Sequence, residues 1–512
     1  MPPVVDLSAL ATAHGVRGTV PDQLDEDALL ALGSAFGEAV ARRAPGAEGL
    51  PRVILGRDVR ESSPSLAAAF SAGLAASGVR VVDLGLASTE TLCYASSWLA
   101  APAAMVTAGH CSARHNGLKL WWSPAAPVGP RAGLREICAR AAELRGSGSQ
   151  RAASPGTGSA VTPAQAAGEV RADDVLSGYA AHLRSLVDLA GIRPLRVVVD
   201  AGNGMAGLTV PSVLGDGAVP AVELVPVFFD LDGSFPFHDA DPSAPVNLLD
   251  LQTAVVANGA DLGLAFDGDA DRCFVVDERG APVSASAVMV LVGLQLLERA
   301  RGDERAVTIL HTETMSRAVP EILGGSGART VVLRASGEEV GAALEQADAA
   351  LAAAPHGRFY YRDFFGADSA LLTALHVVAA VGSQALSLSE LVEIVEPYSG
   401  SGALASVVAD PDAALERVIE AYVTQQGAGP VSVDESDGLL VSHWDEQPRW
   451  WFHLRVEPGA RGTGGARGPG GGTVVLVVEA ADEDIMDKVR DDVLALVREL
   501  DPVAEDEEET DD

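Results

Sequence analysis

Three aspartates within residues 265–277 form the part of this chain best suited to chemistry. Asp267, Asp269 and Asp271 alternate with small residues, and short apolar runs stand on both sides. The apolar runs predict two buried strands joined by a tight acidic turn. Small residues between the aspartates allow the three carboxylates to converge, and converging carboxylates repel one another unless a cation lies among them. Oxygen ligands at this density favour a hard divalent ion, with Mg2+ the first choice.

Arg272 directly follows the third aspartate. A fixed guanidinium beside a metal ion suits the binding of a phosphate group. The alternative is a solvated acidic turn that holds no ligand. Gly268, Arg272 and the flanking apolar runs favour the metal-binding interpretation over this alternative.

The composition of the chain excludes several classes of function. Its 512 residues are enough for roughly three or four domains, and a hydrophobic content of 48% supports buried cores. A net charge of -35 argues against a nucleic-acid partner. We find no apolar run long enough to span a bilayer and no secretory leader, so we expect no membrane partner and a cytoplasmic location. The cysteines form no C-x-x-C pair, which predicts neither a disulfide framework nor a zinc site.

Four segments of strand-like and helix-like stretches must position the aspartates. The first has the βαβ rhythm of a mixed sheet covered by helices, and two further α/β segments follow it. In the fourth, we expect strands near residues 438–442, 450–456 and 473–479 and a helix over 482–500. Residues 146–170 are rich in glycine, serine, proline and threonine, which predicts a flexible linker. The expected domains are residues 1–145, 171–280, 281–385 and 386–502, followed by an acidic tail at 503–512.

Several motifs are similar to those of the α-D-phosphohexomutases, most closely the bacterial phosphomannomutases and phosphoglucomutases. The resemblance covers essentially the whole chain, and DGDADR after an N-G-x-K stretch is its most specific part. The motifs are HGVRG at residues 14–18, GRDVRESSP at 56–64, TAGHCSARHNGLKL at 107–120, DAGNGMAG at 200–207 and FDGDADR at 266–272.

The resemblance implies an α/β fold of four domains around a central cleft. Three are related α/β mixed-sheet units, and the C-terminal domain is a smaller α+β unit. It also implies a reversible shift of phosphate between the 1- and 6-positions of a hexose. An active-site serine carries the phosphate, and Mg2+ lies between the acidic loop and that phosphoserine. A loop of the third unit reads sugar hydroxyls, and a loop of the fourth holds the non-reacting phosphate.

The nucleophile loop departs from the family pattern T-A-S-H-N-P. The position of the phosphorylated serine is Gly109, and glycine has no side chain on which a phosphoryl intermediate could form. The loss also removes a metal ligand, so we expect a weakened Mg2+ site. Ser112 is roughly 10 Å further along an extended loop, too far for in-line transfer without remodelling. Cys111 could carry a phosphate in principle, but a buried structural thiol is the simpler interpretation.

His110 and Lys119 match the proton-handling pair of the family. The chain has only one other lysine, Lys488, and many arginines. A lysine kept in such a chain suits a titratable or phosphate-facing role. An exposed lysine on a strand is the alternative, and the sequence does not decide between the two.

The loop of the third unit, normally G-E-x-S-G-H, is also altered. The carboxylate that would accept two sugar hydroxyls is replaced by Ala354, and the serine by His356. We expect His356 and Arg358 of this loop, together with Arg17 of the HGVRG motif and Arg272, to face substrate or phosphate. The neighbouring pair Glu338 and Glu339 is interpreted as a solvated helix start.

The phosphate loop of the fourth unit, normally R-x-S-x-T-E-P, is replaced by a glycine-rich stretch after Arg455. The hydroxyl donors are gone from their places. Arg461 and Arg467 could reach a phosphate, but ordering a mobile glycine loop has a high entropic cost.

Three functions fit these departures, and the first is favoured. It is a phosphomannomutase-like pseudoenzyme of hexose-phosphate metabolism that binds metal, sugar phosphate or a partner enzyme of nucleotide-sugar supply. The second is an active phosphomannomutase or phosphoglucomutase with altered chemistry, in which a bisphosphate transfers its phosphate directly. The third is a Mg2+-dependent sugar phosphatase in which water replaces the serine.

Overall fold

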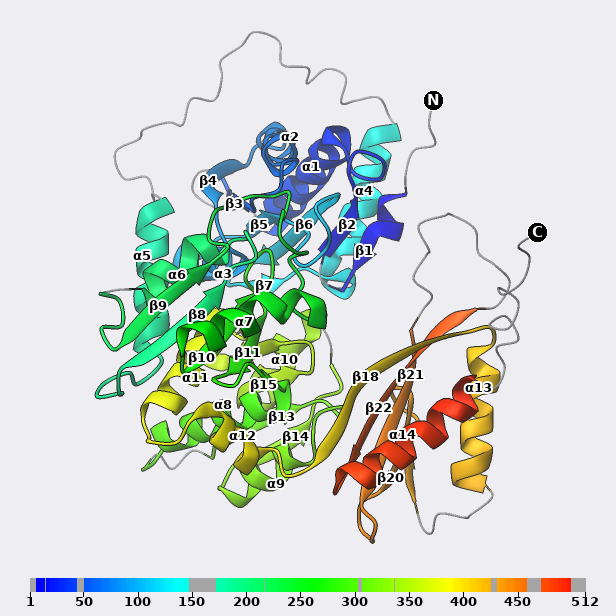
Figure 1. The fold of residues 1–512 in the computed structure, drawn as a ribbon. Helices are drawn as coiled ribbons and strands as arrows, with labels where there is room; N and C mark the ends of the chain where they lie inside the picture. The colour runs from blue at the N-terminus through cyan, green and yellow to red at the C-terminus, as the bar shows by residue number, and fades with distance from the viewer. Residues whose placement is uncertain are drawn as a thin grey trace, which may run out of the picture. The chain divides into compact units, whose positions relative to one another are not determined.

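The computed structural model describes residues 6–13, 15–43, 50–146, 172–215, 217–302, 306–335, 337–424, 431–457 and 471–498 (Figure 1). These residues belong to two compact units. The larger comprises residues 1–313 and 319–392, and the smaller comprises residues 314–318 and 393–512. The expected linker, apart from Gly146, and the acidic tail lie outside the described residues.

The first sheet of the larger unit has seven strands in the order β1-β2-β6-β5-β3-β4, with β7 paired to β6. Strand β3 runs parallel to β4 and β5, whereas β6 is antiparallel to β5 and β2. This is the mixed sheet predicted for the first segment. Its strands are β1 (Ala11–Thr12), β2 (Gly15–Thr19), β3 (Arg52–Arg57), β4 (Arg80–Leu86), β5 (Ala103–Val106), β6 (His115–Trp122) and β7 (Ala126–Pro127). Its helices are α1 (Glu26–Arg43), α2 (Ser63–Ala76), α3 (Thr89–Trp98) and α4 (Arg135–Gly146).

The second sheet has the order β12-β11-β10-β8-β9. Strand β10 is parallel to β8 and antiparallel to β11, and all five of its residues are buried. Its apolar sequence LGLAF therefore suits a strand covered on both faces. The strands are β8 (Leu195–Asp200), β9 (Val222–Val227), β10 (Leu262–Phe266), β11 (Cys273–Asp277) and β12 (Pro282–Val283), and the helices are α5 (Ala172–Ser185), α6 (Ala206–Leu214) and α7 (Leu249–Asn258).

The third sheet has the order β14-β13-β15-β16-β17. It repeats the plan of the second, with parallel pairs on one side of the sheet and antiparallel pairs on the other. The strands are β13 (Thr308–His311), β14 (Arg329–Val332), β15 (Ala349–Ala354), β16 (Arg358–Tyr361) and β17 (Ala367–Asp368). The helices are α8 (Ala285–Arg299), α9 (Ala318–Gly325), α10 (Val340–Ala347), α11 (Ala370–Gly382) and α12 (Leu388–Val395).

Among its described residues, the smaller unit has an antiparallel sheet and two α-helices. Its strand order is β18-β22-β21-β20-β19. The three predicted strands and the final helix are confirmed, whereas the two edge strands were not predicted. One edge strand, β18, reads SGSGALASVV, whose glycines and serines hide its strand character. The elements are β18 (Ser399–Val408), α13 (Pro411–Ile419), β19 (Ser432–Asp434), β20 (Leu439–His443), β21 (Trp450–Glu457), β22 (Gly472–Ala480) and α14 (Glu483–Arg498).

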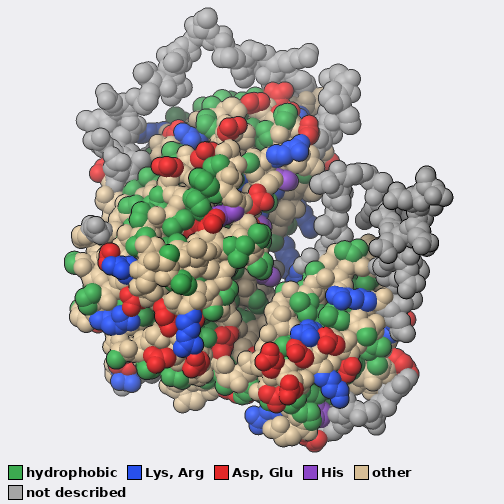
Figure 2. Space-filling model, viewed as in Figure 1, with side chains coloured by type: hydrophobic (Ala, Val, Ile, Leu, Met, Phe, Trp, Pro, Cys, Tyr) green, Lys and Arg blue, Asp and Glu red, His purple; other side chains and the backbone are tan. Residues whose placement is uncertain are grey.

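The surface agrees with the acidic composition. On the face that Figure 2 shows, acidic and basic side chains of the described residues lie interspersed and form no broad basic area. Among the described residues, we find no helix with both the length and the apolar character needed to cross a membrane.

A buried histidine makes the larger unit sensitive to acid. His376 lies in α11, whose thirteen residues are all buried, and its ring stacks on Tyr361 with centroids 5.7 Å apart. Burial, helped by Arg299, lowers the pKa of His376 to about 3. The unfolded chain therefore binds the proton more readily between pH 6.5 and 3, and stability contributed by the neutral ring is lost as the pH falls through this window.

We expect His376→Phe to remove part of this acid sensitivity while keeping the ring stack. Between pH 7 and pH 5 the variant should lose about 2 kcal/mol less unfolding free energy than the wild type. Urea denaturation at the two pH values measures this difference. Equal losses in the two proteins would contradict the expectation.

Candidate functional site

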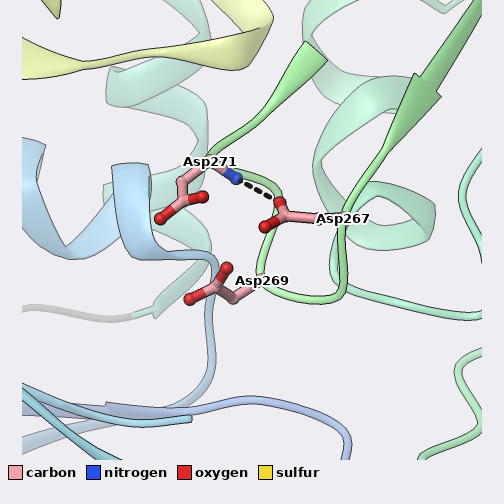
Figure 3. A group of neighbouring side chains, drawn as sticks. All are labelled: Asp267, Asp269 and Asp271. Carbon is pink, nitrogen blue, oxygen red and sulfur yellow. Dashed lines mark hydrogen bonds between the residues drawn. The ribbon is translucent and has the colours of Figure 1, made fainter. Parts of the chain in front are cut away.

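The three aspartates lie in the loop between β10 and β11, with their carboxylates turned toward one another (Figure 3). All three side chains are buried, and their relative exposure does not exceed 1%. The predicted arrangement of two buried strands joined by an acidic turn is therefore confirmed. The alternative of a solvated acidic turn is wrong, because the loop is enclosed by the rest of the larger unit.

Each carboxylate has one oxygen held by the protein. Asp267 Oδ1 accepts hydrogen bonds from the backbone N–H groups of Asp271 and Arg272, at 2.9 and 3.1 Å. Asp269 Oδ2 accepts from Thr89 Oγ1 at 2.8 Å and from Lys119 Nζ at 2.5 Å. Asp271 Oδ2 accepts from Lys119 Nζ at 2.7 Å. These bonds fix the orientation of all three carboxylates.

The other oxygen of each carboxylate has no hydrogen-bond partner among the described residues. These atoms are Asp267 Oδ2, Asp269 Oδ1 and Asp271 Oδ1. One oxygen from each of the three residues lies within 4.8 Å of the others. Buried oxygens without partners are costly unless a cation or water satisfies them. The donor set, three carboxylate oxygens and no nitrogen or sulfur, fits Mg2+.

Lys119 on β6 is buried against this loop. Burial opposes the charge of its ammonium group, but the carboxylates of Asp269 and Asp271 outweigh burial and raise the pKa of Lys119. The lysine is therefore charged, and the alternative of an exposed strand lysine is wrong. Its charge neutralises part of the acidic loop.

A second internal cation, Arg358, stands at the start of β16. Its Nη1 lies 2.9 Å from Asp271 Oδ2 and also donates to Asp368. Burial opposes ionisation of Asp271, yet Arg358 and Lys119 together hold its pKa well below the ordinary value. For Asp267, burial and the charges of Asp271 and Asp269 raise the pKa well above the ordinary value. Without a bound cation, Asp267 therefore holds a proton most readily.

Gly109, the position of the expected phosphoserine, faces the acidic loop. It lies between β5 and β6 with φ of +58°, and its N–H donates to Thr107 Oγ1 at 3.0 Å. A Cβ at this position would lie 3.2 Å from Arg17 Nη2 and 3.2 Å from Asp269 Oδ1. A side chain here would thus point between a guanidinium and a carboxylate oxygen of the acidic loop, but glycine supplies no atom to this place.

Arg60 clamps the loop that contains Gly109. Its side chain is fully buried, and its Nε donates to Asp58 Oδ2 at 3.0 Å. Its two terminal nitrogens donate to four carbonyl oxygens at 2.6 to 3.0 Å, those of Gly109, Cys111, Ser112 and His115. Moving Ser112 into the place of the missing nucleophile would break several of these bonds.

Ser112 and Cys111, the two side chains considered as replacements for the missing serine, each contact a neighbouring side chain. Ser112 Oγ lies 3.0 Å from His115 Nδ1. Cys111 Sγ accepts from Arg17 Nη1 at 3.5 Å and is only partly buried. The interpretation of Cys111 as a buried structural thiol is therefore wrong. The thiol lies at the side of the site, where its contact is with an arginine.

His110 and Arg272 stand beside the same loop. Burial, followed by the charges of Arg272 and Arg17, lowers the pKa of His110 to about 4, so the ring is neutral at pH 7. Its Nδ1 has no partner among the described residues. Arg272 Nε lies 3.8 Å from Asp267 Oδ2. The surroundings of His110 are thus positive, which suits an anionic group.

The third-unit loop is the turn between β15 and β16. Ala354 ends β15, and His356 is exposed in the turn, whereas Arg358 is directed onto the acidic loop. The pair Glu338 and Glu339 is not simply a solvated helix start, because Glu338 accepts hydrogen bonds from the backbone of Arg131 and Ala132, at 2.9 and 3.2 Å.

In the smaller unit, Arg455 lies on β21, while Arg461 and Arg467 lie outside the described residues. A contact of these two arginines with phosphate, the less favoured interpretation of the sequence, stays a hypothesis.

Several contributors to the site were not predicted as such. Thr89, at the start of α3, donates its hydroxyl to Asp269 Oδ2 at 2.8 Å and its backbone N–H to the Asp269 carbonyl at 3.2 Å. Asp58 and Arg60 belong to the GRDVRESSP motif, so a signal for them existed. For Thr89 and for Asp368, no local pattern in the sequence pointed to the acidic loop.

Comparisons with known proteins cover most of the chain. Residues 9–145, 177–280 and 284–398 match the phosphoglucomutase/phosphomannomutase alpha/beta/alpha domains I, II and III. A phosphomannomutase of Salmonella montevideo is 30% identical over 482 residues, which cover 93% of this chain and 97% of that protein. A phosphomannomutase of Salmonella typhimurium is 31% identical over 448 residues, covering 86% of this chain and 91% of that protein.

Solved structures share the fold. A phosphoglucomutase/phosphomannomutase family protein of Burkholderia thailandensis has a TM-score of 0.75 at 26% identity, covering 98% of this chain and 99% of that chain. The N-acetylphosphoglucosamine mutase of Aspergillus fumigatus, in complex with GlcNAc-6P and magnesium, has a TM-score of 0.58 and covers 96% of each chain. At 13% identity, this second likeness supports the fold alone. The chain belongs to the phosphoglucomutase/phosphomannomutase family, the α-D-phosphohexomutases.

Proposed function

We propose that this protein binds a divalent cation and a hexose phosphate at the acidic loop but does not run the covalent phosphoserine cycle of its family. The observation that carries this proposal is the geometry of Gly109. A side chain at this position would point between Arg17 Nη2 and Asp269 Oδ1, each 3.2 Å from its Cβ. Glycine offers no oxygen there, so no phosphoryl group can be stored between two half-reactions.

The cation is Mg2+, held by Asp267, Asp269 and Asp271. Each contributes the carboxylate oxygen that has no other partner among the described residues. Lys119 and Arg358 offset part of the negative charge through the opposite oxygens of Asp269 and Asp271. When bound, Mg2+ would supply positive charge for a phosphate.

The positive side chains beside the acidic loop support the binding of a hexose phosphate. The charges of Arg17 and Arg272 help burial to lower the pKa of His110. Arg17 Nη2 and Arg272 Nε have no hydrogen-bond partner among the described residues. Guanidinium N–H groups that have no other acceptor suit the oxygens of a phosphate. Ala354, where the family pattern has a carboxylate, removes an acceptor for sugar hydroxyls, so binding should depend more on the phosphate than on the sugar.

A coupled mutase assay tests the proposal directly. Mannose 1-phosphate and glucose 1-phosphate would be supplied with Mg2+, with and without a hexose 1,6-bisphosphate, alongside thermal-shift measurements with the same ligands. We expect no turnover above a mock preparation and a thermal shift with Mg2+ and sugar phosphate. Turnover would instead identify an active mutase, and release of free phosphate a phosphatase. Absence of any shift would leave only a role in binding other proteins.

The Gly109→Ser variant should regain the ability to carry phosphate. After incubation with Mg2+ and glucose 1,6-bisphosphate, mass spectrometry should detect a phosphorylated peptide in the variant and none in the wild type. We also expect an unfolding free energy lower by about 1–2 kcal/mol, because a serine in the left-handed region is strained.

Gly259→Ser is the matched control. Gly259 has φ of +55°, and nothing lies within 4 Å of its added Cβ. The control should show the same strain but no phosphorylation. A Gly109→Ser variant that stays unphosphorylated would mean that other parts of the site have also lost phosphoryl transfer.

A further inference from the structure

Glu90, the second residue of α3, is fully buried and accepts four hydrogen bonds. Two come from hydroxyl groups, Ser369 Oγ at 2.5 Å and Tyr179 OH at 2.6 Å. Two come from the backbone N–H groups of Ala370 and Leu371, at 2.6 and 3.1 Å. Tyr179 belongs to α5, and the other donors form the N-terminus of α11. Glu90 therefore joins the first α/β region to helices that accompany the second and third sheets.

The residue before Glu90 contacts the acidic loop. Thr89 donates its hydroxyl to Asp269 Oδ2 at 2.8 Å and its N–H to the Asp269 carbonyl at 3.2 Å. Its hydroxyl also accepts from Lys119 Nζ at 3.3 Å. One turn of α3 thus holds both the acidic loop and the start of α11.

The start of α11 returns to the acidic loop by a second route. Asp368 directly precedes Ser369 and accepts from Arg358, whose Nη1 lies 2.9 Å from Asp271 Oδ2. Peptide links, hydrogen bonds and the ion pair of Arg358 with Asp271 therefore connect Asp269 to Asp271 by a path outside the acidic loop. We call this path the circuit, because the acidic loop closes it. The circuit passes through Thr89, Glu90, Ser369, Asp368 and Arg358.

We propose that Glu90 is a positioning residue for the cation site, setting the separation of Asp269 and Asp271 through this circuit without touching the cation. The inference rests on the proposed cation site. Partners behind the ligands typically change metal affinity 10- to 100-fold when they are lost, because they hold the ligands in the binding geometry. Glu90 acts at both ends of the circuit, through Thr89 on Asp269 and through the α11 N-terminus on Asp271.

The test compares Mg2+ affinity, by isothermal titration calorimetry, in the wild type and three variants of the full chain. Glu90→Ala should bind Mg2+ roughly 10- to 100-fold more weakly. Glu90→Gln should stay close to the wild type, since its carbonyl oxygen can accept the two N–H bonds and its amide can donate to the two hydroxyls. Burial raises the pKa of Glu90 to about 8 against the pull of its donors, so a neutral amide is a fair replacement at pH 7.

Leu74→Ala controls for loss of stability alone. Leu74 is fully buried in α2, outside the circuit, and its truncation leaves a cavity that destabilises the fold. It should leave Mg2+ affinity unchanged. If Glu90→Ala does not fold, Glu90→Asp replaces it: its carboxylate is one methylene shorter and cannot reach all four donors, so weaker Mg2+ binding is again expected.

The outcomes separate the two proposals. Wild-type affinity in Glu90→Ala, or in Glu90→Asp if that variant replaces it, would overturn the positioning role while leaving the cation site intact. Equal weakening in Leu74→Ala would overturn it as well, since instability alone would then explain the effect. A wild type that binds no Mg2+ would overturn the proposed cation site, and the positioning role with it.

Discussion

Lys119→Met is expected to lower the unfolding free energy by about 3–5 kcal/mol when no divalent cation is present, because it removes a buried cation that two buried carboxylates share. The ammonium group lies 2.5 Å from Asp269 Oδ2 and 2.7 Å from Asp271 Oδ2, and all three side chains are buried. Methionine fills most of the volume but supplies no charge. Equilibrium denaturation in urea, with a chelator in the buffer, measures the loss.

Mg2+ should reduce this loss in the Lys119 variant. A divalent cation bound by the same aspartates would take over part of the neutralisation, so saturating Mg2+ should stabilise the variant more than the wild type. Lower pH should help in the same direction, since carboxylates that have lost the lysine charge take up protons more readily in the folded state, and the resulting stability is lost as the pH rises.

The other lysine of the chain provides the control. Lys488 is exposed on α14, so Lys488→Met should change stability by no more than about 0.5 kcal/mol. A Lys119→Met protein as stable as this control, with no response to Mg2+, would mean that the acidic loop does not need the ammonium group.

Arg60→Lys should be nearly as damaging, although it keeps the positive charge. Arg60 donates hydrogen bonds from its two terminal nitrogens to four backbone carbonyls and from its Nε to Asp58. Lysine has three donors on one nitrogen and cannot reproduce this planar fork. We expect a loss of about 3–5 kcal/mol, from several charged hydrogen bonds at about 1.5–3 kcal/mol each with partial compensation by lysine.

The part of the structure that Arg60→Lys loosens is as informative as the size of the stability loss. Hydrogen exchange should quicken first in the loop that Arg60 clamps, residues 109–115, while α11 stays protected until global unfolding. Arg52→Lys is the matched control, because Arg52 is an exposed arginine at the start of β3 whose one hydrogen bond to the described residues goes to the carbonyl of Leu99. It should shift stability by no more than about 0.5 kcal/mol. Uniform acceleration of exchange across the larger unit would argue against a local clamp.

Much of the fold could be predicted because its signals are local. Short, mainly apolar stretches, LRVVV and LGLAF, predicted the strands β8 and β10. The buried positions Met486, Val489, Val493 and Val497 of α14 follow the spacing of an amphipathic helix. The edge strand β18 was missed because its glycines and serines carry no such signal. It becomes a strand by pairing with β22, which is a non-local contact.

The acidic loop and its neighbours were predictable in type but not in arrangement. The alternation of aspartates with small residues predicted a cation site between two strands, and the comparison of motifs placed Gly109 opposite it. The roles of Cys111 and of the Glu338 pair were misjudged because each depends on what packs against the side chain. Arg17 and the backbone of Arg131 come from segments far from these residues in the chain.

By itself, the sequence determined the family, the three α/β sheets, the acidic turn and the missing hydroxyl at Gly109, because each is written in neighbouring residues. Only the tertiary structure decided that Lys119 and Arg358 pair with the Oδ2 atoms of the aspartates. The same holds for the link that Thr89 and Glu90 make between the acidic loop and α11. Lys119 and Asp269 are 150 positions apart, and Glu90 and Ser369 are 279 apart. Such contacts arise when separate sheets pack together, and the energy of a buried charge depends on every group that this packing brings around it.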